Sequence, residues 1–218
     1  MGKFFKYFTD RPWLIAWFAV VTAALLILGL TGHIYIQGDG NITTYEVQAF
    51  LFATAVWCIA KYGFKKDLTA EFILGATFGC QWEFLTWSHW TYLPDKFNIL
   101  IVHRWGLPLI MIPCWGSILA LVICFSNFLA GKVLKIPYKK LIFDKRILLC
   151  DMIAVQVIGC VIEAIVGVWI KAWTYDIDYG MGKSPIGLPW DIHIGYCIII
   201  FWYATTMRVW NRRLDGDL

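Results

Sequence analysis

Six apolar stretches, each long enough to cross a lipid bilayer, constrain this sequence more than any other feature. About 20 residues of α-helix, rising about 1.5 Å per residue, span the ~30 Å hydrocarbon core of a bilayer. The connections between the stretches are short, so residues 1–218 are expected to form a single all-α membrane domain, a polytopic bundle of six transmembrane helices. The expected spans cover residues 13–32, 45–63, 70–92, 107–131, 147–173 and 187–210.

The composition fits a bilayer environment and excludes several other classes of protein. Hydrophobic residues make up 60% of the chain and charged residues only 16%, whereas about a quarter of the residues in soluble domains are charged. A cytosolic enzyme, a DNA-binding module, a disordered regulator and a disulfide-stapled secreted domain are therefore excluded. The 7 cysteines all lie within or at the edge of an expected span and form no C-x-x-C pair, so we interpret them as packing residues rather than as a zinc site or a redox pair.

The lysine and arginine residues predict how the chain is oriented in the membrane. Cytoplasmic loops carry an excess of these residues. Most of the 19 in this chain lie in the two terminal segments and in the second-to-third and fourth-to-fifth connections, and the opposite side carries only Lys96, Arg104, Lys171 and Lys183. Both termini of this multi-pass protein are therefore expected on the cytoplasmic side. The net charge of +4 is then explained by the lysines and arginines on the cytoplasmic side and does not indicate a nucleic-acid partner.

A two-fold internal repeat relates the third and fifth expected spans and the segments that follow them. Three short motifs recur in the same order, about 80 residues apart. Each repeat unit is a hairpin of two helices, so the two units have the same orientation in the membrane and form a parallel repeat. The first unit contains Gly79-Cys80-x-x-Glu83, Trp90-Thr91-Tyr92 and Gly106-Leu107-Pro108, and the second contains Gly159-Cys160-x-x-Glu163, Trp173-Thr174-Tyr175 and Gly187-Leu188-Pro189.

Each repeat unit places one glutamate inside an apolar span. Counted along a continuous helix, Glu83 lies nine residues before Tyr92 and Glu163 lies twelve before Tyr175, which predicts that both lie near the middle of the bilayer. A carboxylate at that depth costs at least about 2.5 kcal/mol unless it faces protein or water. We therefore expect both glutamates to face one internal cavity as catalytic groups. The structural alternative is that each is protonated and only holds the bundle together through a hydrogen bond to a neighbour.

Further polar and aromatic residues accompany the two glutamates. Asp191 stands two residues after Pro189 at an expected helix start, where it serves either as a third catalytic carboxylate or as a favourable charge for the helix dipole. The 4 histidines are too few and too scattered for a di-iron centre, and we expect neither a metal nor another cofactor. Residues of the two hairpins are expected to bind an apolar substrate, namely Trp82, Trp87, His89, Trp90, Tyr92, Trp169, Trp173 and Tyr175. An aromatic belt at the headgroup level is the alternative for those near the span ends.

The short motifs of this chain resemble those of the membrane-integral terpenoid and carotenoid cyclases. The similarity is to the fungal meroterpenoid cyclases of the paxilline and pyripyropene pathways and to the lycopene-cyclase-domain and carotenoid hydratase proteins. Ile192 follows Asp191 where the lycopene-cyclase pattern has a second acid. The residues that carry the resemblance are Trp82-Glu83, Trp90-Thr91-Tyr92, Trp173-Thr174-Tyr175 and Pro189-Trp190-Asp191.

This resemblance implies acid-initiated chemistry, either cyclisation or hydration, on an apolar isoprenoid-like substrate. In such chemistry a buried carboxylic acid protonates an alkene or epoxide, and aromatic rings shield the carbocation until a base quenches it. On this sequence Glu83 is the leading acid, with Glu163 or Asp191 as the second acid or base. The expected class is thus a cyclase-like lyase or isomerase of terpenoid biosynthesis, whose partners are the substrate and the lipid bilayer.

Two other classes of function remain open from the sequence. The same glutamates would suit a small-molecule or proton-coupled transporter, or a substrate-binding membrane subunit. Secondary transporters often carry Gly or Pro breaks in mid-membrane, whereas Pro108, Pro113 and Pro189 lie toward the outer ends of their spans, which favours a fixed pocket. A structural subunit of a larger membrane complex is the second alternative, and the protein partners are left open.

Overall fold

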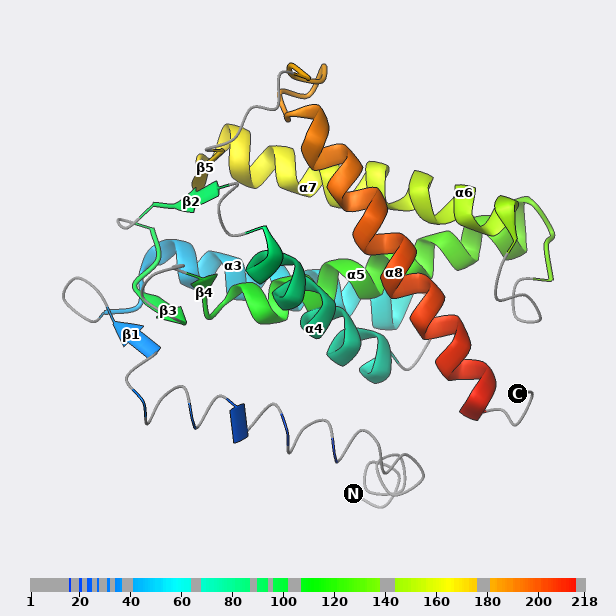
Figure 1. Ribbon diagram of the computed structural model, residues 1–218, viewed down its shortest axis with the longest axis horizontal. Coiled ribbons are helices and arrows are strands. Elements are labelled where there is room, and N and C mark those ends of the chain that lie inside the picture. Colours follow the sequence, from blue (N-terminus) through cyan, green and yellow to red (C-terminus); the bar gives the residue numbers. More distant parts are fainter. Residues whose placement is uncertain are drawn as a thin grey trace.

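The computed structural model shows a mostly helical protein with short strands at one end, which we call the strand end (Figure 1). Among the residues that it describes, three helices are long and apolar enough to cross a membrane: Met111–Val133, Lys145–Trp169 and Trp190–Val209. The described residues are 34–36, 41–63, 68–86, 90–93, 96–101, 107–137, 144–175 and 181–214, together with Ala16, Val20, Ala23, Ala24, Ile27 and Thr31.

Several of the long helices contain π-helical segments, in which each backbone hydrogen bond reaches five residues along the chain. The helical segments in chain order are α3 (Thr44–Cys58), η1 (Ile59–Gly63), α4 (Thr69–Leu85), α5 (Met111–Phe128), η2 (Leu129–Val133), α6 (Lys145–Ala154), η4 (Val155–Cys160), α7 (Val161–Glu163), η5 (Ala164–Trp169) and α8 (Trp190–Leu214). The segments from α6 to η5 follow one another without a break and form a single long helix.

Side chains at two helix starts explain where these helices begin. Thr43 and Glu46 form a capping box: the Thr43 hydroxyl accepts a hydrogen bond from the Glu46 N–H (3.1 Å), and the Glu46 carboxylate accepts one from the Thr43 N–H (2.9 Å). At the start of α6, the Asp144 carboxylate accepts a hydrogen bond from the Arg146 N–H (2.7 Å). The Arg146 guanidinium also donates to this carboxylate and lowers the pKa of Asp144 to about 2.

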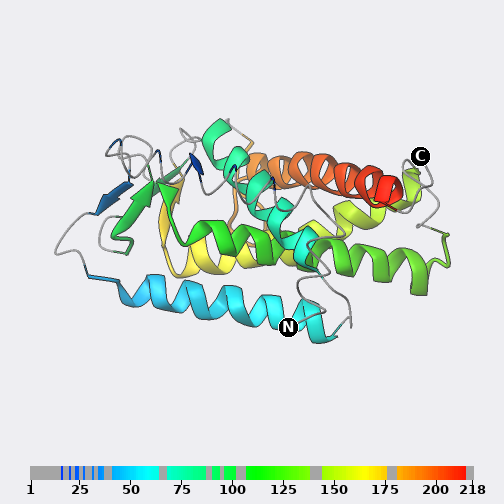
Figure 2. The ribbon, with the colours of Figure 1, turned by 90° about the horizontal axis from the view of Figure 1, so that it is seen from below.

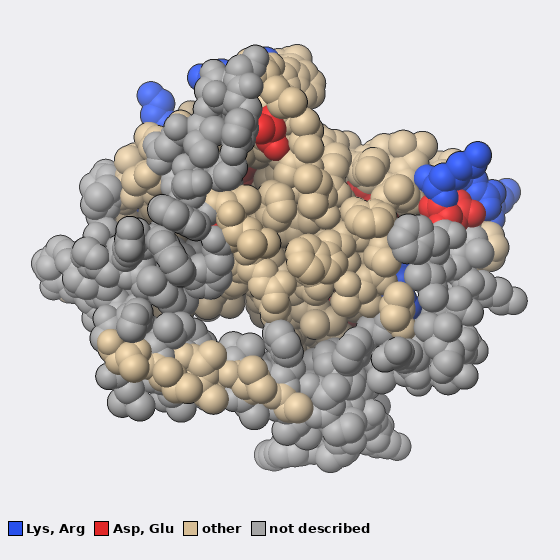
Figure 3. Space-filling view, in the orientation of Figure 1, with Lys and Arg blue, Asp and Glu red and all other residues tan. Residues whose placement is uncertain are grey.

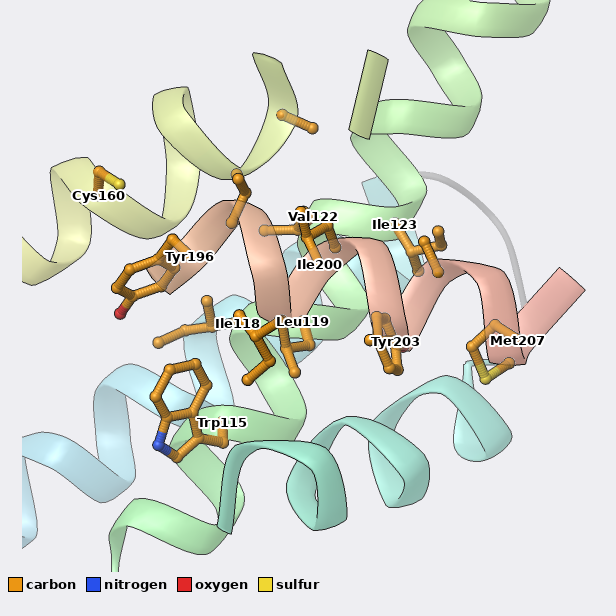
Figure 4. Close-up of a cluster of buried hydrophobic side chains, with 14 of the residues drawn as sticks. Trp115, Ile118, Leu119, Val122, Ile123, Cys160, Tyr196, Ile200, Tyr203 and Met207 are labelled. Atoms are coloured by element: carbon orange, nitrogen blue, oxygen red, sulfur yellow. The ribbon is translucent and has the colours of Figure 1, made fainter. Parts of the chain in front are cut away.

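α5 lies at the centre of the bundle, with α3 on one side and α8 on the other (Figure 2). Two glycines allow α4 and α5 to approach closely. A Cβ added at Gly75 would lie 3.0 Å from the Leu119 Cβ, and one added at Gly116 would lie 2.8 Å from the Phe72 carbonyl oxygen. Part of the apolar core lies between α5 and α8, and Leu119 and Tyr203 are completely buried there (Figure 4).

Large apolar side chains cover much of the outward surface of the helices. Phe50 on α3, Ile153 on α6 and Trp202 on α8 are all exposed. Figure 3 shows that the middle of the face over α8 is uncharged, with acidic and basic side chains gathered toward its edges. Contiguous exposed apolar surface of this kind is unfavourable in water and is the usual surface of helices that contact lipid.

The short strands form two antiparallel sheets at the strand end of the bundle. The first has the order β1-β3-β4, formed by Ile34–Ile36, Ile99–Ile101 and Leu107–Pro108. The second pairs β2 (Trp90–Tyr92) with β5 (Trp173–Tyr175), so the two Trp-Thr-Tyr motifs lie against each other. The all-α expectation omits these strands, although β-branched and aromatic residues, which favour strands, are frequent in them.

The helix bounds confirm part of the expected set of spans. The three helices of membrane length match the expected spans 107–131, 147–173 and 187–210 to within four residues at each end. The expected span 45–63 is helical from Thr44 to Gly63. The span 13–32 lies largely outside the described residues. The number of six spans and the cytoplasmic position of both termini therefore stay predictions.

The expected span 70–92 is wrong in its last part. α4 ends at Leu85, and residues 90–92 form strand β2 instead of continuing the helix. Residues 90–92 pair instead with β5, about 80 residues away in the sequence, and hydropathy does not contain such a long-range contact.

Candidate functional site

A cavity of about 430 Å³ lies between α4, α5, α7 and α8, close to the strand end of the bundle. Its size falls within the range of small-molecule binding sites. All three carboxylates that the sequence singles out, Glu83, Glu163 and Asp191, line this one cavity. Five aromatic side chains also line it: Trp82, Tyr92, Trp115, Trp173 and Tyr196.

Glu83 is buried and is held by two aromatic donors. Its Oε1 accepts hydrogen bonds from the Tyr92 hydroxyl (2.8 Å) and from the Trp115 indole N–H (2.8 Å). Tyr92 comes from strand β2 and Trp115 from α5, so the carboxylate joins three elements. Two neutral aromatic side chains, rather than a lysine or arginine, thus make these contacts with the Glu83 carboxyl group.

Glu163 is half-buried and has three aromatic donors. Its Oε1 accepts hydrogen bonds from the Trp173 indole N–H (3.1 Å) and the Tyr175 hydroxyl (2.7 Å), and its Oε2 accepts one from the Tyr196 hydroxyl (2.8 Å). Burial and the neighbouring Glu163 raise the pKa of Tyr175 above its ordinary value. The Tyr175 hydroxyl is therefore protonated at neutral pH and donates to Glu163.

Trp115 and Tyr196 occupy corresponding positions of the sequence repeat, each seven residues after the proline of a Gly-Leu-Pro motif. Each donates to the glutamate of its own repeat unit. Their rings lie side by side with centroids 5.7 Å apart and planes tilted by 31°, at one end of the buried cluster in Figure 4. The two glutamates are thus connected through a pair of adjacent aromatic rings.

The glycines of the repeated Gly-Cys motifs make room for these two rings. A Cβ added at Gly79 would lie 2.1 Å from the Trp115 Cγ, and one added at Gly159 would lie 2.9 Å from the Tyr196 Cδ1. Real Cβ atoms do not approach other atoms so closely, so any larger residue would displace the ring. The glycine, the aromatic ring and the glutamate therefore form one packed unit in each half of the site.

The paired strands β2 and β5 bring the tyrosines back to the glutamates. In this pair Thr91 lies opposite Thr174, with Tyr92 opposite Trp173 and Trp90 opposite Tyr175. The Tyr92 hydroxyl then contacts Glu83, and the Tyr175 hydroxyl contacts Glu163, at nearly the same distance. Corresponding residues of the two Trp-Thr-Tyr motifs thus make corresponding contacts.

Glu83 lies nearer the end of its helix than the sequence predicts. The prediction used a continuous helix from Glu83 to Tyr92, but α4 ends at Leu85 and the chain returns through β2. Glu83 therefore lies two residues from the helix end, or about 3 Å at ~1.5 Å per residue. The prediction of a position in the middle of a long span is wrong for this glutamate.

Glu163 differs from Glu83 in the helix that carries it. It ends the three-residue segment α7, which lies between the π-helical segments η4 and η5. The helix continues for six residues after Glu163, which accommodates the three extra residues between Glu163 and Tyr175 relative to the first repeat unit. π-Helical segments widen the turn and are often found at functional sites.

The structure brings some of the expected substrate-binding residues to the cavity and places another elsewhere. Trp82, Tyr92 and Trp173 line the cavity, and the Tyr175 hydroxyl contacts the Glu163 carboxylate. Trp169 is 70% exposed and is absent from the cavity lining. The expected residues Trp87 and His89, and the side chain of Trp90, lie outside the described part of the structure.

Two residues of the site, Trp115 and Tyr196, are missing from the sequence-based set. The repeat contains the signal that finds them, because both are aromatic and both follow their Gly-Leu-Pro motif by the same number of residues. No cluster of three or more His, Cys, Asp or Glu residues arranged to hold a metal ion occurs within the described ranges. The site chemistry that these residues offer is that of carboxyl groups in an aromatic cavity.

Comparison with known proteins found no family model that matches the chain, no curated protein with a similar sequence and no solved structure with a similar fold. The geometry of the cavity and the chemistry of its carboxyl groups are therefore the basis for a function.

Proposed function

We propose that this protein is a membrane-embedded enzyme that performs acid-initiated cyclisation or hydration of an apolar, isoprenoid-like substrate. The observation that carries the proposal is the convergence of Glu83, Glu163 and Asp191 on one aromatic-lined cavity. A cavity of this kind excludes bulk water, which prolongs the life of a carbocation. Indole and phenol faces stabilise positive charge by cation–π attraction, by about 0.5–2 kcal/mol for each ring.

The carboxyl groups take different roles in the proposed reaction. Protonated Glu83 transfers its proton to an alkene carbon of the substrate, which forms a C–H bond and leaves a carbocation and the Glu83 carboxylate. Glu163 is held in the cavity by three aromatic hydrogen-bond donors, which position it as the second acid–base group. The cation then either loses a proton to Glu163 or Asp191, or combines with a water molecule that loses its proton to one of them.

The proposal includes the six-span arrangement with a parallel repeat of two hairpins and cytoplasmic termini. Two observations support it. The Trp-Thr-Tyr strands pair with each other in an antiparallel manner, as expected for two hairpins related by a two-fold axis along the membrane normal. Corresponding glycines also contact corresponding aromatic residues in the two halves of the site.

A proton-coupled transporter is the second candidate, and one observation favours it. The helix that carries Glu163 is π-helical on both sides of this residue, and irregular helices at buried charges occur in transporters. The transporter would use the same two glutamates to relay a proton, and no covalent bond of the substrate would change. Product analysis therefore separates the two candidates.

The test uses Glu83→Gln and Glu163→Gln proteins in native membranes, supplied with a panel of prenyl alcohols, their epoxides and linear polyenes. We expect each variant to lose about 10²–10⁴-fold in the rate of product formation, because that is the usual contribution of a general acid or base. The matched control is Glu71→Gln, a buried glutamate on the same helix as Glu83 but outside the cavity. Full product formation by both cavity variants would end the proposed acid–base role.

A further inference from the structure

α8 forms one wall of the cavity. Its residues Ile194 and Ile198 line the cavity and are also 47% and 50% exposed on the outside of the bundle. On the α4 side, Trp82 and Thr86 line it. At the two isoleucines a single layer of side chains therefore separates the cavity from the exterior, and we call this part the lateral wall. Met181, in the segment before α8, is a further lining residue that is exposed (52%).

The surface around the lateral wall is apolar. Phe201 and Trp202 continue the exposed side of α8 beyond Ile198, and the described face over α8 is uncharged in its middle (Figure 3). α8 contains one of the three helices of membrane length. In the proposed membrane arrangement the lateral wall therefore faces the lipid chains rather than water.

The polarity of the cavity changes along its length. Glu83 lies two residues before the end of α4, and Asp191 lies in the first turn of α8, so the carboxylates gather at the strand end. Ile198 follows Asp191 by seven residues, which is about 10 Å deeper along α8 at ~1.5 Å per residue. The cavity is thus acidic at the strand end and apolar further into the bundle.

Trp82 packs against α8 between these two ends. A Cβ added at Gly195 would lie 2.8 Å from Cζ2 at the far end of the Trp82 ring, so the indole packs directly on the α8 backbone. A carboxylate end, an apolar end and a thin lateral wall that borders the lipid together match a single-chain amphiphile.

Given the proposed function, on which this inference rests, the geometry points to a single-chain isoprenoid amphiphile that enters sideways from the bilayer. Its polar, reacting end lies at Glu83 and Glu163, and its hydrocarbon chain leaves the cavity through the lateral wall, past Ile194 and Ile198. The substrate class is therefore a lipid already dissolved in the membrane leaflet on the strand side.

The test measures binding, so it does not depend on catalysis. The probes are two farnesol analogues in phosphatidylcholine vesicles that contain the full chain, one with a diazirine next to the hydroxyl and one with a diazirine at the far end of the chain. After illumination, labelled residues are located by mass spectrometry. We expect the first probe to label the region of Glu83 and Asp191, and the second to label α8 around Ile198, with both signals removed by excess unlabelled farnesol.

Variants at the lateral wall give the second measurement. Ile198→Trp places a bulky ring in the lateral wall, and its matched control Ile153→Trp changes an equally apolar, 44% exposed isoleucine on α6 that does not line the cavity. We expect Ile198→Trp to reduce competable labelling about tenfold, because the indole occupies the path of the hydrocarbon chain, and we expect the control to leave the labelling unchanged. Ile194→Trp serves as the second lateral-wall variant if Ile198→Trp fails to fold.

Each outcome supports or overturns the inference. Competable labelling with the expected order of the two probes, weakened by the lateral-wall variants alone, supports it. Reversed order of the probes, equal loss in the Ile153→Trp control, or labelling spread over all apolar faces without competition overturns it. Competable labelling in the expected order, without any product formation, would support this binding mode and contradict the proposed acid-initiated reaction.

Discussion

The two repeat glycines offer a graded test of the packing that holds the glutamates. Gly79→Ala would place a Cβ 2.1 Å from Cγ, 2.3 Å from Cβ and 2.5 Å from Cδ2 of Trp115. These atoms lie at the root of the side chain, so a rotation of the indole does not relieve the overlap. α4 and α5 must move apart, and the Trp115 N–H must leave the Glu83 carboxylate that it contacts at 2.8 Å.

The expected magnitude follows from three contributions. Overfilling a well-packed site costs up to ~3 kcal/mol, and a buried hydrogen bond left unmade costs about 1–3 kcal/mol. Replacing glycine by alanine in a helix returns about 1 kcal/mol. We therefore expect Gly79→Ala to lower the free energy of unfolding by about 3–5 kcal/mol.

Gly159→Ala is the matched, milder change in the second half of the site. Its Cβ would approach the Tyr196 ring to 2.9 Å, so a smaller shift suffices, and we expect a loss of ~1 kcal/mol or less after the helix gain. Gly63→Ala is the control, because a Cβ at Gly63 meets no atom within 4 Å. It should leave the protein as stable as before or stabilise it slightly.

The free energy of unfolding can be measured in mild detergent by titration with a denaturing detergent, followed by the circular dichroism of the helices. The predicted order of stability is Gly63→Ala, then Gly159→Ala, then Gly79→Ala. The reasoning would be refuted if the free energies of unfolding of the Gly79→Ala and Gly159→Ala proteins differed by less than about 1 kcal/mol. The overlap with the first atoms of the Trp115 side chain would then cost no more than the contact with the edge of the Tyr196 ring.

Two further predictions concern charged groups away from the cavity. Asp151 is 1% exposed and forms a bidentate salt bridge with the Arg208 guanidinium (2.6 and 2.7 Å). Asp151→Asn should lower the free energy of unfolding by about 3–5 kcal/mol, because a buried guanidinium loses its charged partner. An unchanged unfolding midpoint would contradict this. The Lys96 ammonium donates to the carbonyl oxygens of Ile170 (2.8 Å) and Lys171 (2.6 Å) just after η5. Lys96→Met should therefore destabilise the protein by about 2 kcal/mol and speed amide hydrogen exchange around these two residues. Unchanged exchange would show that Lys96 does not hold this segment in place.

The long helices could be predicted from the sequence because their signal is local. Runs of apolar residues identify α5, the helix from α6 to η5, and α8, and each prediction falls within four residues of the observed bounds. The error at α4 has a different origin. Trp90, Thr91 and Tyr92 form a strand whose partners lie about 80 residues away in the sequence. Hydropathy averages over neighbours in sequence and does not contain this contact.

The sequence repeat predicts part of the candidate site. The repeat singles out Glu83 and Glu163, which line one cavity, and extending it by a few residues would also find Trp115 and Tyr196. The repeat does not contain the exposed position of Trp169. This residue ends the π-helical segment η5, whose turns depart from the 3.6 residues per turn of a regular helix. Irregular turns of this kind leave no clear mark on composition or spacing.

The pairing of β2 with β5 has a consequence for how such a site arises. Two copies of one motif that lie antiparallel across a local two-fold axis form the same interface as a symmetric homodimer. A dimer of identical halves would have to give both carboxylates the same surroundings. Joining the halves in one chain removes that restriction, so an indole can face Glu83 where a phenol faces Glu163. Duplication followed by divergence would thereby give two equivalent glutamates unequal roles in a shared cavity.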